Sequence, residues 1–227
     1  MRFLFARSRT PRRRTAVLVA LVWVASAGLL GSAAGSEPAD SILAALQARY
    51  EGIADLRADF VQEAHVASID KLDRSSGRVV MQRPGRMRWE YSAPEKRVIV
   101  VADGTLRVYT PSDSQLQVLQ VSGAFSPMAL GFLLGDGDLR ESFVGEPLDS
   151  GSRDEIGIRL RPREDSAFER LEMWLAKDSH QVVESVVFDL FGNRTSVRFA
   201  EIRENVGVDE GAFEIDVPEG TEIVDLR

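Results

Sequence analysis

The chain has 227 residues, of which 44% are hydrophobic, and it holds 28 Lys and Arg against 35 Asp and Glu. This length and balance fit one globular domain of ordinary size. The first 34 positions contain six arginines and no acid, so the remaining body holds 22 basic and 35 acidic residues, a net charge of −13. Such an acidic body would repel phosphate backbones, so we expect no nucleic-acid partner. The absence of cysteine excludes disulfides, thiolate metal sites, cysteine nucleophiles and a lipid-modified N-terminal cysteine.

The N-terminal segment has the three parts of a secretory signal peptide. The basic region from Arg2 to Arg14 precedes an uncharged apolar run, Ala16 to Leu30, and small residues follow at Ser32 and Ala34. We expect cleavage after Ala34, so residues 1–34 are removed and export leads to the periplasm. A signal anchor is the alternative, because the uncharged stretch of 19 residues is just long enough to span a bilayer.

The mature chain, residues 35–227, is expected to form a single domain that opens with one helix. Ser36-Glu37-Pro38 is a typical helix start, and the apolar residues that follow recur at spacings of three and four until Gly52. This spacing predicts an amphipathic helix. From Leu56 onward the period of the apolar residues changes to two, which indicates strands.

Alternating runs then dominate the chain. The predicted strands after the one beginning at Leu56 are 77–82, 86–91, 97–102, 105–109, 115–121, 156–160, 168–175, 182–190, 194–202 and 213–217. Asp103-Gly104 is typical of a two-residue hairpin turn, and Lys177-Asp178 and Gly192-Asn193 indicate further turns. Because no strand–helix–strand rhythm appears, we expect an antiparallel sheet that curls into a barrel, a partial barrel or a sandwich.

A second helix is predicted in the break between Ser122 and Val144. Ser126-Pro127 starts it, Gly135 ends it, and it is apolar nearly all round. Such a helix is either buried in the core or lies as a lid over an apolar cavity. The uncharged stretch Ser114 to Gly135 contains three Gln and a Pro, so we interpret it as a strand plus this helix and not as a membrane span.

The segment Arg86 to Tyr91 alternates cleanly. Met87, Trp89 and Tyr91 share one face, and charged residues occupy the other. Taken alone, this is an ordinary half-buried strand, and Arg83 in the turn before it is an ordinary surface residue.

The chain lacks the sequence motifs that would indicate an enzyme. His65 and His180 stand far apart, and the chain has neither HExxH nor G-x-S-x-G. Asp136-Gly137-Asp138 lacks the remaining ligands of a calcium loop, and nothing singles out a pair of carboxylates for glycoside hydrolysis. We therefore expect binding without catalysis, with no metal and no cofactor.

Several stretches together resemble the LolA family, the periplasmic carriers that ferry lipoproteins to the bacterial outer membrane. The first matching residues are Ala58-Asp59-Phe60-Val61-Gln62, Gly77, Arg83 to Tyr91, Pro94, Asp103-Gly104 and Tyr109-Thr110-Pro111. Further on they are Ser126-Pro127, Leu133-Leu134 and Phe213 to Gly220. The likeness runs in order from about Ala39 to Asp225. The chain departs from the family pattern at Met87, where an aromatic residue is frequent, and at Thr110, where Asp or Asn is frequent.

The resemblance implies a mainly β fold, an antiparallel sheet curved into an incomplete, half-open barrel with a few helices covering a concave hydrophobic cavity. It also implies that Arg83 is the latch that holds the lid helix closed through hydrogen bonds to its backbone. The acyl-chain cavity is then expected to be lined by Phe60, Met87, Trp89, Tyr91, Met128, Leu130, Phe132, Leu133 and Leu134. Met is adaptable enough to line such a pocket.

The function implied is a carrier that binds lipoprotein acyl chains and transfers them from the inner to the outer membrane. A soluble protein can do this only by burying the chains, since each CH₂ is worth about 0.8 kcal/mol. The implied partners are acylated lipoproteins, the LolCDE transporter as donor and LolB or an equivalent acceptor, and we expect a monomer. The alternatives are a carrier of another lipid or glycolipid, a lipoprotein-sensing regulator and, least favoured, a hydrolase.

Overall fold

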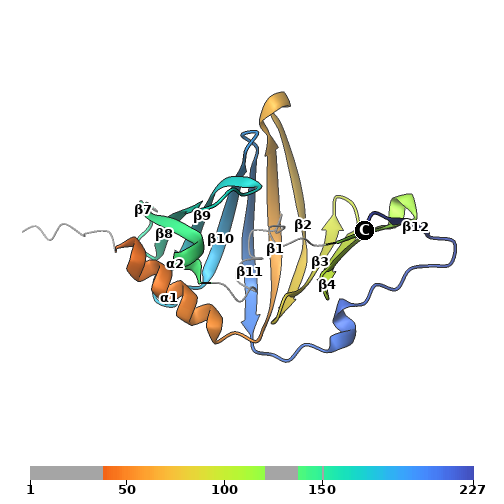
Figure 1. The fold of residues 1–227 in the computed structure, drawn as a ribbon, viewed down its shortest axis with the longest axis horizontal. Coiled ribbons are helices and arrows are strands. Elements are labelled where there is room, and N and C mark those ends of the chain that lie inside the picture. The colour runs from red at the N-terminus through yellow and green to blue at the C-terminus, as the bar shows by residue number, and fades with distance from the viewer. Residues whose placement is uncertain (1–37, 121–137, 150) are drawn as a thin grey trace, which may run out of the picture. The chain divides into compact units, whose positions relative to one another are not determined.

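The computed structural model describes residues 38–120, 138–149 and 151–227 (Figure 1). All of them belong to one compact unit, Ser36–Arg227. The helical elements of the described residues are α1 (Ala39–Glu51), α2 (Leu139–Ser142) and the 3-10 turns η1 (Ala67–Ile69), η2 (Pro111–Asp113) and η4 (Glu210–Phe213). Among the described residues, no helix has the length and apolar character needed to cross a bilayer.

One sheet contains all the described strands, in the order β12-β6-β5-β4-β3-β2-β1-β11-β10-β9-β8-β7. Their bounds are β1 (Asp55–Val66), β2 (Lys71–Gln82), β3 (Arg86–Ala93), β4 (Arg97–Ala102), β5 (Thr105–Thr110), β6 (Gln115–Gln120), β7 (Phe143–Leu148), β8 (Glu155–Pro162), β9 (Phe168–Ala176), β10 (Val182–Asp189), β11 (Arg194–Glu204) and β12 (Glu222–Asp225). Neighbouring strands are antiparallel except β12 and β6, which are parallel. Within this set β12 and β7 are edges that do not pair with each other, so the prediction of an antiparallel sheet that stops short of a closed barrel is confirmed.

Helix α1 forms where the sequence predicts it. Pro38 occupies the N-cap position, and Gly52 the C-cap, where its backbone N–H donates to the Arg49 carbonyl. The buried side chains Ile42, Leu43, Leu46 and Tyr50 form one stripe and face the sheet. Figure 1 shows α1 and α2 lying against the β7–β10 end of the sheet. We call the side of the sheet that faces α1 the inner face and the opposite side the outer face.

Turn chemistry sets the register of the strands. Asp103 and Gly104 both have positive φ, 51° and 72°, as a two-residue turn between antiparallel strands requires. Gly77 is needed for a different reason, because a Cβ atom there would lie 2.0 Å from the Glu90 carbonyl oxygen on β3. The predicted hairpin at Asp103-Gly104 is thus confirmed, and Gly77 permits the close approach of β2 and β3.

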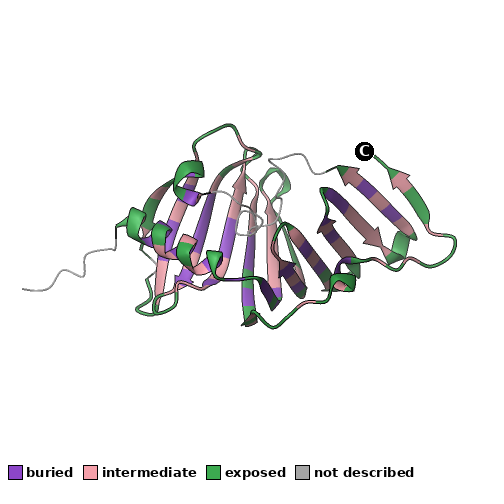
Figure 2. Ribbon diagram, turned by 60° about the horizontal axis from the view of Figure 1, so that its bottom comes forward, coloured by how far each residue is buried: buried purple, intermediate pink, exposed green. Residues whose placement is uncertain are grey.

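The strands bury apolar residues on both faces. The main core lies between α1 and the inner face, and Figure 2 shows buried residues alternating with less buried ones along the strands. A smaller core lies on the outer face, where Phe213 packs against Val100 and Ala102. The segment carrying Phe213 is attached near β1, because the buried Asp55 carboxylate accepts hydrogen bonds from the backbone N–H groups of Val206 and Gly207 at 2.9 and 3.1 Å.

The prediction of a strand over 213–217 is wrong. Residues Glu210–Phe213 form a 3-10 turn, and residues 214–217 form no strand. Arg88 explains the difference, since its Nη1 donates to the carbonyl oxygens of Ala212 and Glu214. These backbone acceptors are thus used by a side chain, while Phe213 fills the outer core.

Other boundaries also differ from the prediction. Strand β2 begins at Lys71 instead of 77, because its polar first half pairs with β1 near the hairpin tip, where neither face needs apolar residues. Strand β7, at the edge, accommodates Pro147, and the pairing of β12 with β6 has no signal in local alternation. The helix predicted over 126–135 lies outside the described residues.

Candidate functional site

Four of the predicted cavity residues meet on the inner face. Phe60 on β1 lies with its ring centroid 4.7 Å from that of Trp89 and 5.1 Å from that of Tyr91, both on β3, in edge-to-face contacts. Trp89 is 1% exposed and Phe60 2% exposed. The Trp89 indole N–H donates to the sulfur of Met87, which is also buried. We call Phe60, Met87, Trp89 and Tyr91 the aromatic cluster. Its members face one way because residues two apart on a strand share a face.

The apolar surface continues beyond the aromatic cluster onto strands that the sequence interpretation did not include in the site. The inner face continues across β3, β4 and β5 through the paired residues Trp89↔Ile99, Ile99↔Val108 and Met87↔Val101. Ile99, Val101 and Val108 are only half-buried, as is Leu119 on β6. The signal was present in the sequence, because the two-residue turn at Asp103-Gly104 places Val101 opposite Leu106 and so determines which residues of β4 and β5 share a face.

Phe199 on β11 is a further inner-face residue that was missed. It pairs with Phe60 in register, and its ring centroid lies 6.3 Å from that of Trp89. Which strand neighbours β1 on this side cannot be derived from the alternation of either strand.

Arg83, the predicted latch, lies in the turn between β2 and β3. Its Nη1 donates to the carbonyl oxygen of Tyr50 at 3.0 Å, and its backbone N–H donates to the carbonyl of Ala54 at 2.8 Å. Arg83 therefore joins the sheet to the last turn of α1. This described bond is to the backbone of α1; the mid-chain helix of the latch prediction lies outside the described residues, so the latch role stays a prediction.

The remaining predicted cavity residues, Met128, Leu130, Phe132, Leu133 and Leu134, lie outside the described residues. Their contribution to a cavity stays a prediction.

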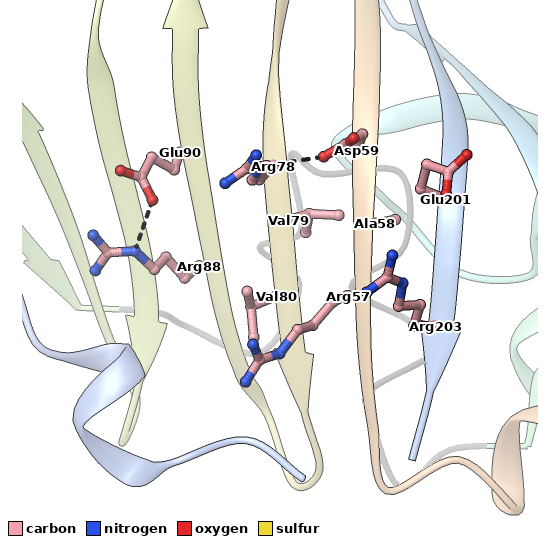
Figure 3. A pocket seen from close by; sticks show the side chains of 10 residues that line it. All are labelled: Arg57, Ala58, Asp59, Arg78, Val79, Val80, Arg88, Glu90, Glu201 and Arg203. Atoms are coloured by element: carbon pink, nitrogen blue, oxygen red, sulfur yellow. Dashed lines mark ion pairs between the residues drawn. The ribbon is translucent and has the colours of Figure 1, made fainter. Parts of the chain in front are cut away.

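The outer face contains a groove of a different character. It has a volume of about 480 Å³ and lies over β1, β2, β3 and β11 (Figure 3). Its charged lining consists of Arg57, Asp59, Arg78, Arg88, Glu90, Glu201 and Arg203. Arg78 pairs with Asp59 at 3.4 Å and Arg88 with Glu90 at 3.6 Å. A second groove, of about 720 Å³, shares Asp59, Arg78 and Glu90 with it. These charges make the groove in Figure 3 unsuitable for an acyl chain, because burying a charge against hydrocarbon is costly.

No group of three or more potential metal ligands occurs within the described residues. Burial raises the pKa of Tyr91, although the nearby Arg97 charge opposes that shift, and burial raises the pKa of Tyr50 to about 12. Both hydroxyls therefore stay protonated at neutral pH and are available as hydrogen-bonding groups.

A mainly β protein with one open sheet, apolar on the face that a helix covers, is a fold suited to holding apolar ligands. The family model described as "Outer membrane lipoprotein carrier protein LolA" matches residues 51–216. The chain belongs to the LolA family, and the resemblance seen in its sequence is thus confirmed.

Relatives of known name are similar over most of their length. An outer-membrane lipoprotein carrier protein of Methylobacillus flagellatus is 27% identical over 179 residues, covering 79% of this chain and 86% of the relative. One from Chromobacterium violaceum is 28% identical over 185 residues, covering 81% and 87%. Among solved structures, an uncharacterized conserved protein of Thermus thermophilus superposes with a TM-score of 0.52 at 16% identity, covering 83% of this chain and 99% of that one. That last likeness concerns the fold alone.

Proposed function

We propose that this protein is a periplasmic carrier that binds the acyl chains of lipoproteins and transfers them from the inner membrane to the outer membrane. The observation that carries the proposal is the apolar inner face, which extends from the buried aromatic cluster to half-buried Ile99, Val101 and Val108 on β4 and β5. The names of the relatives support lipoproteins as the cargo. Export requires that residues 1–34 act as a signal peptide.

The apolar inner face can supply the free energy of binding. Apolar residues that are only half-buried can still gain transfer free energy when an acyl chain covers them, at about 25 cal/mol per Å². The periplasm supplies no ATP, so the cargo must leave for an acceptor of higher affinity. In this scheme the LolCDE transporter is the donor, LolB or an equivalent protein is the acceptor, and a monomer presents its cavity to each in turn.

Native mass spectrometry of the mature protein, purified from the periplasm of its own host without detergent, tests the cargo. We expect a fraction that carries the mass of an acylated lipoprotein. A fraction carrying only free lipid or glycolipid would instead support a lipid carrier with the same fold. Protein that stays empty when donor membranes are supplied would contradict the proposal.

Arg83 is proposed as the latch of this carrier. Its hydrogen bond to the Tyr50 carbonyl ties the β2–β3 turn to α1, at one end of the apolar face. If closing this contact helps to expel cargo, then Arg83→Leu retains bound lipoprotein and slows its transfer to acceptor membranes by about tenfold or more, the effect of one charged hydrogen bond.

The chain offers a matched control for that experiment. Arg163→Leu also removes an arginine that donates to a helix carbonyl, since Arg163 Nε bonds to the Arg140 oxygen at 3.1 Å on α2. We expect this variant to release cargo at the wild-type rate. Equal release by Arg83→Leu and wild type would show that Arg83 is structural and no latch.

A further inference from the structure

The apolar lining of the inner face ends along a definite row of residues. On β1 the buried Phe60 is followed on the same face by Gln62, which pairs with Ser75 on β2. One step nearer the hairpin tip, Ala64 lies between Asp73 on β2 and Thr195 on β11. On β1 and β2 the face therefore changes from apolar to polar at Gln62, whereas Val197, its partner on β11, is still buried and apolar.

Three polar groups meet at this boundary. The Tyr91 hydroxyl donates a hydrogen bond to Gln62 Oε1 at 3.0 Å, across β1, β2 and β3. The Arg97 guanidinium carbon lies 5.9 Å from the centroid of the Tyr91 ring, because Tyr91 and Arg97 pair in register on β3 and β4. We call Gln62, Tyr91 and Arg97 the rim cluster. It touches the aromatic cluster directly, since Tyr91 belongs to both.

The rim cluster presents hydrogen-bond donors that are not used within the described part of the chain. Since Tyr91 donates to the Gln62 amide oxygen, the amide NH₂ group is directed away from that hydroxyl and has two N–H donors to offer. Arg97 is exposed and forms no ion pair with any described residue. Its guanidinium has five N–H donors in one fixed plane and can bind a carboxylate or a carbonyl oxygen.

We propose that the rim cluster binds the oxygen-bearing head of a fatty acyl chain, meaning the carbonyl or carboxylate oxygens that join the chain to the rest of the cargo. This inference rests on the proposed function, because it takes the acyl chain to lie on the inner face. A carbonyl drawn into the apolar region would lose its hydrogen bonds to water, which is costly. Donors at the apolar boundary satisfy that group, and so set both the depth and the direction in which the chain lies.

Each residue of the rim cluster has a separate role. Arg97 favours an ionised or strongly polar head, and Gln62 donates to a carbonyl oxygen. Tyr91 holds the Gln62 amide in place and is a positioning residue. The cluster thus discriminates between ligands by their heads, whereas the half-buried residues Ile99, Val101 and Val108 recognise only the hydrocarbon.

Binding of three ligands with the same twelve-carbon chain tests this division. Dodecanoate, methyl dodecanoate and 1-dodecanol are titrated at neutral pH into the mature protein carrying Trp174→Phe, so that the fluorescence comes from Trp89, whose ring lies 6.5 Å from that of Tyr91. We expect wild type to bind dodecanoate about tenfold more tightly than dodecanol, as one charged hydrogen bond implies. Arg97→Gln removes this preference and leaves the affinity for dodecanol unchanged.

The other variants separate the two donors. Gln62→Leu is expected to lower the affinity for methyl dodecanoate about threefold to tenfold, the effect of one neutral hydrogen bond, and to change the affinity for dodecanol little. Tyr91→Phe should also weaken the binding of methyl dodecanoate, but by less, because it frees the Gln62 amide without removing it. Arg107→Gln is the matched control, because Arg107 pairs with Val100 and faces the outer side.

The outcomes distinguish this inference from the function on which it rests. If wild type binds dodecanoate and dodecanol equally, or if Arg107→Gln changes the preference as much as Arg97→Gln does, the rim cluster has no such role and the carrier function stands. If folded wild type binds none of the three ligands, the inner face holds no acyl chain, and both proposals are wrong.

Discussion

The two halves of the inner face have similar sequence patterns but are covered to different degrees. On β8 and β9, the inner residues Ile158, Leu160 and Met173 are 0% exposed, because they belong to the core beneath α1. On β4 and β5, Ile99, Val101 and Val108 alternate with outward-facing residues in the same way and stay half-buried. The sheet is one continuous structure, so the difference arises from what packs on each half.

This comparison separates stability from binding. The covered half has already gained its transfer free energy on folding, and it can give a ligand nothing further. The half-buried side chains retain apolar surface from which an acyl chain can still gain free energy. A substitution in the first half should therefore act on unfolding, and one in the second half mainly on binding.

The largest expected effect is on the covered half. Ile158→Ala should lower the free energy of unfolding by about 2–5 kcal/mol, because it leaves a cavity beneath α1. Urea denaturation measures the change as a lower midpoint at constant slope. Val144→Ala on edge strand β7, where Val144 is exposed, should change stability by less than about 0.5 kcal/mol. A similar small cost for Ile158→Ala would contradict the description of a sealed core.

Tyr50 provides a pH test of the same half. Burial raises its pKa from 10.0 to about 12, and its hydroxyl oxygen accepts a hydrogen bond from the backbone N–H of Val182. The unfolded chain therefore loses this proton first, so stability is complete below pH 10 and falls as the pH rises from 10 to 12. At about 1.36 kcal/mol per pH unit, the loss amounts to about 2–3 kcal/mol.

Urea denaturation between about pH 9 and pH 11.5 checks this expectation. Tyr50→Phe should be less stable than wild type at the lower pH by about 1 kcal/mol, since the Val182 N–H loses its partner. Its stability should then fall less steeply as the pH rises. Parallel curves for the two proteins would mean that Tyr50 is not protected from ionisation.

A smaller effect on stability is expected for the half-buried residues of β4 and β5. Ile99→Ala should lower the free energy of unfolding by only about 1 kcal/mol but weaken dodecanol binding about fourfold or more, because lost CH₂ groups reduce ligand contact. Val98→Ala is the matched control, since Val98 is its neighbour on β4 and packs in the outer core. Equal weakening by both substitutions would show that the ligand does not lie on the inner face.

Local patterns in the sequence predicted much of this molecule. Alternation identified the strand Arg86 to Tyr91, the spacing of apolar residues identified α1, and Asp103-Gly104 determined a hairpin and its register. Each of these features depends on neighbours in the chain, because the backbone periodicity of about 3.6 or 2 residues places side chains on one face whatever lies opposite. The aromatic cluster followed from the same rule, with help from the family resemblance for Phe60.

Contacts between distant residues decided the rest. Phe213 does not lie in a strand as predicted, because it fills the outer core against Val100 and because Arg88 donates to backbone carbonyl oxygens of that segment. Arg83 donates to the carbonyl oxygen of Tyr50, 33 residues away in the chain, and Tyr91 donates to Gln62, 29 residues away. The sequence by itself therefore determined which side chains share a face. Only the tertiary structure decided which half of that face is sealed and which polar groups border it, because burial and hydrogen-bond partners depend on segments that local periodicity does not connect.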